Sequence, residues 1–437
     1  MKIKLLNKWP QLIILNSALL TLFTSCSIQK QIARSAKADV RDTKALQTAH
    51  VGISIFDPAT NKYLYNYQGD KYFVPASNTK LPTCYAAMKY LGDSLVGLRY
   101  QTLQEDSMIM IWETGDPSFL HPDFRNQPIF DFLKKFKRIS FVGTRYSDFF
   151  GNGWAWNDYK EDYMAQRSGF PIYGNVIRLK WESTEKVISI PKFFQKDFFV
   201  AEKMKNGFEV IKPWEENKII FWNGKQKNKD VPFHPDMATI SGLLKDTLGI
   251  NVYVNYSELP FQKLVIHSQP TDSLLKPMMH RSDNFFAEQS LLMVSNEMLG
   301  VMNDEKIIDT LLKTDFKDLP QKPRWVDGSG LSRYNLFTPQ DFVFILNKMK
   351  NEFGMERIKV ILPTGGEGTI SSYYKADSGY IFGKTGTLSG VVAFSGFLYT
   401  KKGKLLIFST LVNNHQASAT EVRRAMERFL QGVRNKY

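Results

Sequence analysis

Strand-like segments lie near both ends of the chain, and this arrangement constrains the fold more than any other feature. Residues 50–68 alternate apolar and polar side chains around a turn at residues 57–61, which predicts a β-hairpin. Residues 379–414 contain three further strand-like runs, and the chain then ends in a helix with one apolar stripe from Val422 to Val433. Two strands from one end and three from the other predict a single sheet, so the long middle segment must be an insertion.

The predicted fold class is therefore α+β, an α/β arrangement in the broad sense, with a central antiparallel five-stranded sheet flanked by helices. The chain has 437 residues, of which 43% are hydrophobic, and this length suits two or three domains. We expect residues 49–94 and 265–437 to build the domain with the central sheet. Residues 95–264 are rich in aromatic strand-like runs and turn signals, and are expected to form an inserted, mainly β domain.

The first 26 residues have the pattern of a secretory targeting segment. Lys2, Lys4 and Lys8 form a basic region, and residues 12–23 form an apolar region that is too short to span a bilayer comfortably. Small residues then precede Cys26, which resembles the lipobox of bacterial lipoproteins and predicts lipidation of that cysteine. A plain secretory signal with an incidental cysteine is the alternative. The polar and basic residues that follow, 27–48, are predicted to be a partly helical tether.

Charge and cysteine content narrow the possible partners. The net charge of +14 could favour a nucleic acid, a membrane or a cell wall. No basic run is long enough, or interleaved with enough aromatic residues, to predict nucleic-acid binding, and scattered solvated lysines account for the charge. The only cysteines are Cys26 and Cys84, and Cys84 falls on the apolar face of a predicted helix, so we expect a core residue and no disulfide. The six histidines form no cluster, and we expect no metal and no cofactor.

A serine followed by a lysine three residues later is the first candidate for catalysis. The pattern Ser-x-x-Lys occurs six times, beginning at residues 27, 77, 183, 189, 273 and 372, so a single match is weak. Only Ser77 and Lys80 open an apolar-striped helix directly after a two-strand hairpin. Pro82 follows them and predicts a local kink, because proline removes one backbone donor.

Two further motifs occur once each. The only Ser-x-Asn sequence lies at residues 282–284, and the only Lys-Thr-Gly sequence lies at residues 384–386. Each alone could equally be a polar loop or a lysine on a strand. In this order after Ser77 and Lys80, they match the motif set of penicillin-binding proteins and class A β-lactamases.

Longer runs support the same interpretation. They are WVDGSGLSRYNLFTP at residues 325–339, LPTGGEGTI at 362–370 and GYIFGKTGTLSGVVAFSGFLY at 379–399. With them, most of residues 49–434 resembles the serine-type D-alanyl-D-alanine carboxypeptidase/endopeptidase family that carries a large insertion. This is peptidase family S13, the class C type of low-molecular-mass penicillin-binding protein. The long interval between the first two motifs fits that insertion, and the resemblance implies a β-lactamase/transpeptidase-like domain around the central sheet.

The spacing of Ser77 and Lys80 suits a nucleophile and its base. A serine hydroxyl is a poor nucleophile until a base takes its proton, and Lys80 projects from the same helix face one turn away. Lys80 can act as that base if its pKa falls toward neutrality, which burial and the second cation Lys384 would both promote. The resemblance implies that Ser282 relays a proton to the leaving amine and that Asn284 holds Lys80 and the substrate amide.

The remaining predicted site residues would bind the substrate. The resemblance implies that the segment of Lys384, Thr385, Gly386 and Thr387 receives the terminal carboxylate of a D-Ala-D-Ala stem peptide. It also implies that the backbone N–H of Thr387 completes an oxyanion hole with the N–H of Ser77.

The sequence therefore predicts a bacterial periplasmic lipoprotein that hydrolyses D-Ala-D-Ala or related cross-links in peptidoglycan stem peptides through an acyl-enzyme on Ser77. β-Lactams would be covalent inhibitors. A lipid anchor would attach the protein to a membrane, and Ser27 after Cys26 favours the outer membrane. Two alternatives remain. One is a β-lactamase of the same fold, which lacks support because no deacylating glutamate loop is recognisable. The other is a non-catalytic cell-wall-binding lipoprotein, against which the intact motifs argue.

Overall fold

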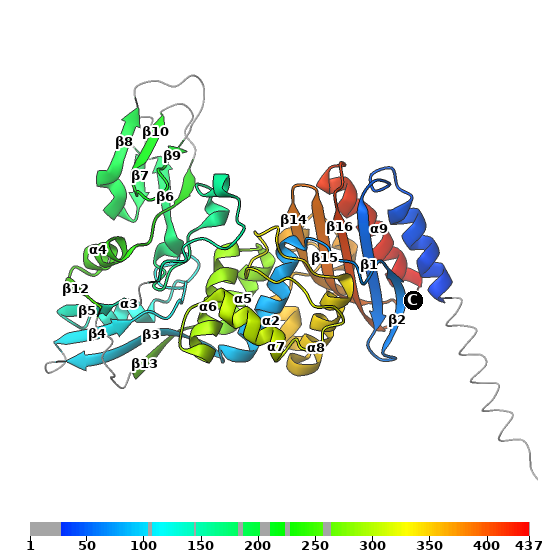
Figure 1. Cartoon of the computed structure of the whole chain (residues 1–437), viewed down its shortest axis with the longest axis horizontal. Coiled ribbons are helices and arrows are strands. Elements are labelled where there is room, and N and C mark those ends of the chain that lie inside the picture. The colour runs from blue at the N-terminus through cyan, green and yellow to red at the C-terminus, as the bar shows by residue number, and fades with distance from the viewer. Residues whose placement is uncertain are drawn as a thin grey trace, which may run out of the picture.

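The computed structural model describes residues 28–103, 107–143, 146–181, 187–201, 210–222, 228–256 and 264–436. The predicted targeting segment and the lipidation site at Cys26 lie outside the described residues. Within these ranges no helix is long and apolar enough to cross a membrane. Figure 1 shows an elongated molecule, with the central sheet and its helices toward one end and the sheets of the middle segment toward the other.

The central sheet has five strands in the order β14-β15-β16-β1-β2, and every neighbouring pair is antiparallel. Strand β1 from the N-terminal end pairs with β16 from the C-terminal end, with His50 opposite Asn413. This confirms the predicted α+β fold and the five-stranded sheet built from both ends of the chain. The strands are β1 (His50–Asp57), β2 (Lys62–Tyr67), β14 (Ile381–Leu388), β15 (Val391–Tyr399) and β16 (Leu405–Asn413).

One face of the sheet is covered by the C-terminal helix and by the N-terminal segment. Helix α9 (Ala419–Lys436) packs on this face, and residues 28–41 are helical and lie against α9. Ile32 and Val40 are 2% and 1% exposed and belong to the same core cluster as the sheet. We predicted a partly helical tether for residues 27–48. Residues 28–41 are helical, but they are packed on the folded domain and do not form a free tether. The few apolar side chains of this segment are buried together, so the segment is part of the folded domain.

The other face of the sheet is covered by the helices that carry the predicted catalytic motifs. The short turn η2 (Ala76–Thr79) leads directly into α2. Pro82 lies in the first turn of α2, where its missing N–H has no helical partner to lose, so it does not interrupt the helix. Cys84 is 0% exposed among apolar side chains, as predicted for a core residue. The helices of this layer are α2 (Lys80–Tyr90), α5 (Thr271–His280), α6 (Asn284–Leu299), α7 (Asp304–Lys313) and α8 (Pro339–Ile361).

Among the described residues, the strands of the middle segment pair only with one another. The larger sheet has the order β12-β5-β4-β3-β13, so the first and last strands of the segment are neighbours and return the chain to α5. We propose an inserted domain on this basis. The last strand of its larger sheet ends at Pro270, so the domain extends six residues beyond the predicted bounds of 95–264. The strands of the larger sheet are β3 (Ser94–Leu103), β4 (Met108–Trp112), β5 (Arg138–Val142), β12 (Asn251–Asn255) and β13 (Leu264–Pro270).

The rest of the insert consists of two small sheets and two helices. The sheets have the orders β11-β6-β7 and β8-β10-β9. Their strands are β6 (Val176–Trp181), β7 (Val187–Ile190), β8 (Phe198–Ala201), β9 (Val210–Ile211), β10 (Ile219–Trp222) and β11 (Lys229–Pro232), and the helices are α3 (Pro128–Leu133) and α4 (Met237–Leu248). Further short helical turns, within the insert and outside it, lie at Lys37–Arg41, Trp156–Asp158, Asp162–Met164, Tyr173–Asn175, Lys192–Asp197, Gly368–Ile370 and Lys375–Asp377.

Candidate active site

The turn before α2 holds Ser77 against the edge strand β14. Ala76 in this turn has a φ of 47°, a left-handed conformation that is unfavourable for a non-glycine residue and clusters at functional sites. Two glycines make room for the turn. A Cβ on Gly330 would lie 2.0 Å from the carbonyl oxygen of Ala76, and a Cβ on Gly386 would lie 3.0 Å from the backbone nitrogen of Ser77. Close packing of two backbone segments therefore sets the position of the Ser77 hydroxyl.

Lys80 lies behind Ser77 and is held by three oxygen atoms. Its Nζ is 3.0 Å from Oγ of Ser77, 2.6 Å from Oδ1 of Asn284 and 2.8 Å from the carbonyl oxygen of Ser329. The lysine side chain is 0% exposed, whereas Ser77 is half-buried and faces a cleft. An accessible hydroxyl is thus in contact with a buried amine one helical turn away.

Burial changes the acidity of both lysines at the site. It lowers the pKa of Lys80 to about 8, because the charged amine loses hydration, while the carboxylates of Asp327 and Glu288 act in the opposite direction. The pKa of Lys384 is lowered well below its usual value, first by burial and then by the charge of Lys80. We predicted that burial and Lys384 would together lower the pKa of Lys80. Burial lowers the pKa of Lys80, and the repulsion between the two amines appears as a further lowering of the pKa of Lys384.

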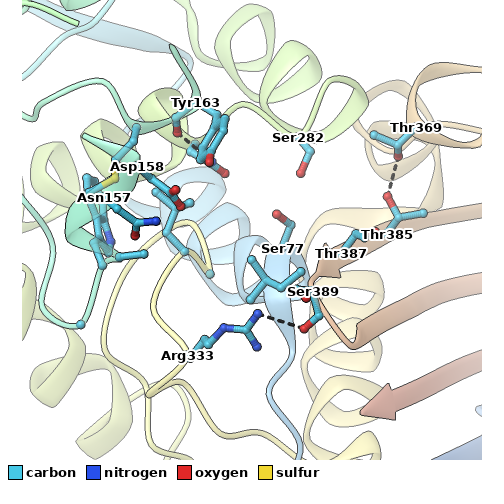
Figure 2. A pocket seen from close by; sticks show the side chains of 18 of the residues that line it. Ser77, Asn157, Asp158, Tyr163, Ser282, Arg333, Thr369, Thr385, Thr387 and Ser389 are labelled. Carbon is cyan, nitrogen blue, oxygen red and sulfur yellow. Dashed lines mark hydrogen bonds between the residues drawn. The ribbon is translucent and has the colours of Figure 1, made fainter. Parts of the chain in front are cut away.

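Ser282 lies across the cleft from Ser77 and is held by Lys384. Its φ of 63° makes it the second non-glycine residue of the site in a left-handed conformation. The Nζ of Lys384 donates to Oγ of Ser282 at 2.9 Å and to the carbonyl oxygen of Thr385 at 2.6 Å. Figure 2 shows the Ser77 and Ser282 side chains turned toward the same space, with Thr385 and Thr387 on the strand beside them.

These side chains open onto a cleft of about 750 Å³, bounded by β14, by the loop after residue 327 and by a loop of the insert. Asn284 links the insert to the site: its Oδ1 accepts from Lys80 and its Nδ2 donates to the carbonyl oxygen of Tyr163 at 2.9 Å. The cleft also presents one acidic side chain, Asp158, and two arginines, Arg333 and Arg423. It can therefore receive a polar ligand that carries charged groups.

The buried carboxylate of Asp327 organises the loop that carries Ser329. Its oxygens accept the backbone N–H of Gly330 at 2.8 Å and that of Ser332 at 2.7 Å. The indole N–H of Trp154, a residue of the insert, donates to the same carboxylate at 3.0 Å. The insert therefore supports the loop that carries Ser329, whose carbonyl oxygen contacts Nζ of Lys80.

A second buried carboxylate, Glu288 of α6, lies beside the same loop. It accepts the backbone N–H of Ser329 at 2.8 Å and pairs at 3.4 Å with Arg167, a residue of the insert. Both side chains are almost fully buried. Burial raises the pKa of Glu288, with the charge of Asp327 adding to this effect and the charge of Arg167 opposing it. The insert thus places a buried cation three contacts away from Lys80, through Glu288 and Ser329.

The fold brings every predicted site residue of its described part to this one cleft: Ser77, Lys80, Ser282, Asn284, Lys384, Thr385, Gly386 and Thr387. Sequence reasoning missed the residues that support them. Trp154 and Asp158 lie in the run GWAWNDYKEDY, which was a usable signal, whereas Glu288, Arg167 and Arg423 carry no motif. In the described ranges, no three His, Cys, Asp or Glu residues are grouped as a metal site.

The chain that carries this site is similar in sequence to known proteins. The chain matches the D-Ala-D-Ala carboxypeptidase 3 (S13) family over residues 32–205 and 249–433. It is 23% identical over 474 residues to the D-alanyl-D-alanine carboxypeptidase DacB of Haemophilus influenzae, a match that covers 94% of this chain and 95% of that protein. The match therefore extends over the insert as well as the motifs.

Solved structures share the fold. Penicillin-binding protein 4 (dacB) of Haemophilus influenzae, which has also been solved with a β-lactam, aligns with a TM-score of 0.72 at 21% identity over 93% of this chain and 98% of that chain. A predatory peptidoglycan endopeptidase of Bdellovibrio bacteriovorus aligns with a TM-score of 0.54 at 13% identity, over 89% and 93%. The shared fold agrees with the family match, which spans most of the chain. The resemblance predicted from the motifs is confirmed, and the chain belongs to the D-Ala-D-Ala carboxypeptidase 3 (S13) family.

Proposed function

We propose that this chain is a serine D-alanyl-D-alanine peptidase that cleaves peptidoglycan stem peptides, or cross-links between them, through an acyl-enzyme on Ser77. The observation that carries the proposal is the contact of 3.0 Å between Oγ of Ser77 and the buried Nζ of Lys80. A lysine with a pKa of about 8 is partly neutral near pH 7, so it can take the proton from the serine hydroxyl. Family membership supports the same reaction class.

In the acylation step, neutral Lys80 takes the proton of Ser77 as Oγ attacks the carbonyl carbon of the penultimate D-Ala. The negative charge that develops on the carbonyl oxygen would be stabilised by the backbone N–H groups of Ser77 and Thr387. The C–N bond then breaks. The leaving nitrogen receives the proton held by Lys80 through the hydroxyl of Ser282, and an ester on Ser77 remains.

Deacylation repeats this proton transfer with water in place of the serine. The water gives a proton to Lys80 and attacks the ester carbon, and Ser77 recovers its proton as the shortened peptide leaves. Asn284 keeps the base in place throughout, because its side-chain oxygen accepts from the amine at 2.6 Å. A β-lactam would enter the same step, but its leaving amine stays tethered and obstructs the water, so the adduct would persist.

The test is to compare a β-lactam and a peptide on the same protein. Fluorescent penicillin should label the full-length chain at a ratio of one to one, the label should persist, and Ser77→Ala should abolish it. A peptide ending in D-Ala-D-Ala should be turned over with release of D-Ala. Rapid turnover of penicillin without D-Ala release would favour the β-lactamase alternative. Absence of any labelling would favour a non-catalytic wall-binding protein.

We further propose that the protein is a periplasmic lipoprotein attached to a membrane through Cys26, with the outer membrane favoured by Ser27. A basic start, a short apolar region and small residues before Cys26 support this proposal. Because residues 28–41 are packed on α9, the anchor would be only a residue or two from the folded domain. Labelled fatty acid should be incorporated into the wild type and not into Cys26→Ala, which should appear in the soluble fraction. A membrane fraction that is unchanged by the substitution would contradict the anchor.

A further inference from the structure

The charge partner of the substrate's terminal carboxylate is not obvious from the motifs. The resemblance assigns the carboxylate to the segment that begins with Lys384, but this lysine is 0% exposed. Its Nζ is used by Oγ of Ser282 and the carbonyl oxygen of Thr385, and its pKa is lowered well below the usual value. Toward the cleft, the same segment presents the hydroxyls of Thr385 and Thr387. Hydroxyls alone provide no formal charge for a carboxylate.

The guanidinium of Arg423 supplies a positive charge beside Thr387. Arg423 comes from the first turns of α9, lines the same cleft as Ser77, and its Nη2 donates to Oγ1 of Thr387 at 2.6 Å. A guanidinium has five N–H donors in a planar fork, and this bond uses one of them. Within the described ranges, no carboxylate lies within 4.0 Å of Arg423. Its guanidinium carbon also lies 5.9 Å from the centre of the Tyr373 ring, at the outer limit of a cation–π contact, and such a contact uses none of the N–H donors that remain for a ligand.

Arg424, the next residue of α9, is by contrast held by several contacts within the fold. The Nη1 of Arg424 pairs with the carboxylate of Glu427, and its Nη2 donates to the carbonyl oxygen of Ser372 at 3.2 Å. Its guanidinium also lies 4.5 Å from the ring centre of Tyr373. Arg424 does not line the cleft. Two consecutive arginines of α9 therefore differ: one is paired within the fold and the other faces the site.

We propose that Arg423 determines specificity by binding the α-carboxylate of the residue that leaves on acylation, together with the hydroxyls of Thr385 and Thr387. A carboxylate beside Thr387 would meet the guanidinium in a charge-assisted, two-pronged contact. The substrate class is then a peptide whose leaving residue carries a free carboxylate on the carbon next to the scissile nitrogen. Terminal D-Ala meets this condition, and so does a cross-link to a diamino acid that keeps a carboxylate at that carbon. A cross-link to the side-chain amine of lysine does not.

The inference rests on the proposed peptidase reaction, and its test separates the two. Full-length wild type, Arg423→Gln, Arg423→Lys, Arg333→Gln and the matched control Arg424→Gln are compared on one D-Ala-D-Ala peptide as the free acid and as its C-terminal amide. Release of D-Ala or of D-alaninamide gives kcat and KM for each. Arg423→Gln should lower kcat/KM for the acid about 10- to 100-fold and remove most of the preference over the amide, since hydrogen bonds to charged groups are worth about that much. Arg423→Lys should restore part of the preference, because charge returns without the planar fork. Arg424→Gln should keep the wild-type preference.

Three results would overturn the assignment. Equal losses for acid and amide in Arg423→Gln, with an unchanged melting temperature, would mean that this arginine acts on the site as a whole. An unchanged acid preference in that variant would mean that it does not touch the carboxylate. A preference that disappears in Arg333→Gln instead would transfer the role to the other arginine of the cleft. If the wild type releases no D-Ala at all, the peptidase proposal fails, which is a different outcome from each of these.

Discussion

The rate of acylation should depend on pH through the buried base. The pKa of Lys80 is about 8, against an ordinary value of 10.5 for lysine. At pH 7 about one Lys80 side chain in eleven is then neutral, compared with about one in three thousand for an unperturbed lysine. Because the neutral amine takes the proton of Ser77, the second-order rate constant for labelling by fluorescent penicillin should rise about tenfold from pH 6 to pH 7. The plot of this rate constant against pH should bend near pH 8 and stay level at higher pH.

The measurement is rapid-quench labelling at constant ionic strength, with the melting temperature recorded at each pH. Two variants act as controls. Lys80→Arg keeps the charge but cannot give up its proton in this range, so its rate should be lower by orders of magnitude and independent of pH. Glu288→Gln removes a negative charge that raises the pKa of Lys80, so the bend should move to lower pH. A level profile between pH 6 and 8 in the wild type, or normal acylation by Lys80→Arg, would refute the role of Lys80 as base.

Three further results are expected, and the second of them has a matched control. Asn284→Ala removes the bonds that this amide makes to the base and to a carbonyl oxygen of the insert, so penicillin labelling should slow about 10- to 100-fold; a rate within twofold of wild type would contradict its positioning role. Gly330→Ala places a methyl group 2.0 Å from the carbonyl oxygen of Ala76 at a φ of 85°, and should lower the free energy of unfolding by about 2 kcal/mol or more and abolish labelling. As the control, Gly249 also has a positive φ, but a Cβ there would meet no atom within 4 Å, so Gly249→Ala should lower the free energy of unfolding by about 1 kcal/mol and leave labelling intact. Equal effects of the two substitutions would show that backbone strain, and not the contact with Ala76, matters. Cys84 is buried and its pKa is raised to about 12, so the folded chain should show no reaction of this thiol with a disulfide reagent until it is denatured.

Local sequence patterns were enough to predict the central sheet. The alternation of apolar residues in strands and the apolar stripe of the terminal helix are both short-range patterns, so they can be recognised without knowledge of the fold. The pairing of β1 with β16 agrees with the expected sheet built from both ends of the chain. The same reasoning failed for residues 27–48. There, isolated apolar residues such as Ile32 and Val40 stand among many charged ones, and only the presence of α9 and the sheet shows that they are buried.

The sequence by itself determined the chemistry of the site. The site is encoded by short motifs: a serine followed by a lysine one helical turn later, a Ser-x-Asn run and a Lys-Thr-Gly run. Each motif can be recognised in the sequence without knowledge of the fold. The sequence could not determine how these groups are tuned. The low pKa of Lys80 arises from complete burial, which is a property of the packed molecule.

Only the tertiary structure decided which distant residues surround the motifs. Trp154 reaches Asp327, and Arg167 reaches Glu288, across more than one hundred residues of sequence. Arg423 reaches Thr387 from a different element, although its neighbour Arg424 is the same residue type on the same helix. Helical periodicity cannot distinguish such residues, because their roles depend on which face of another element lies opposite. The physical reason is that burial and electrostatic environment are set by segments that meet only when the chain has folded.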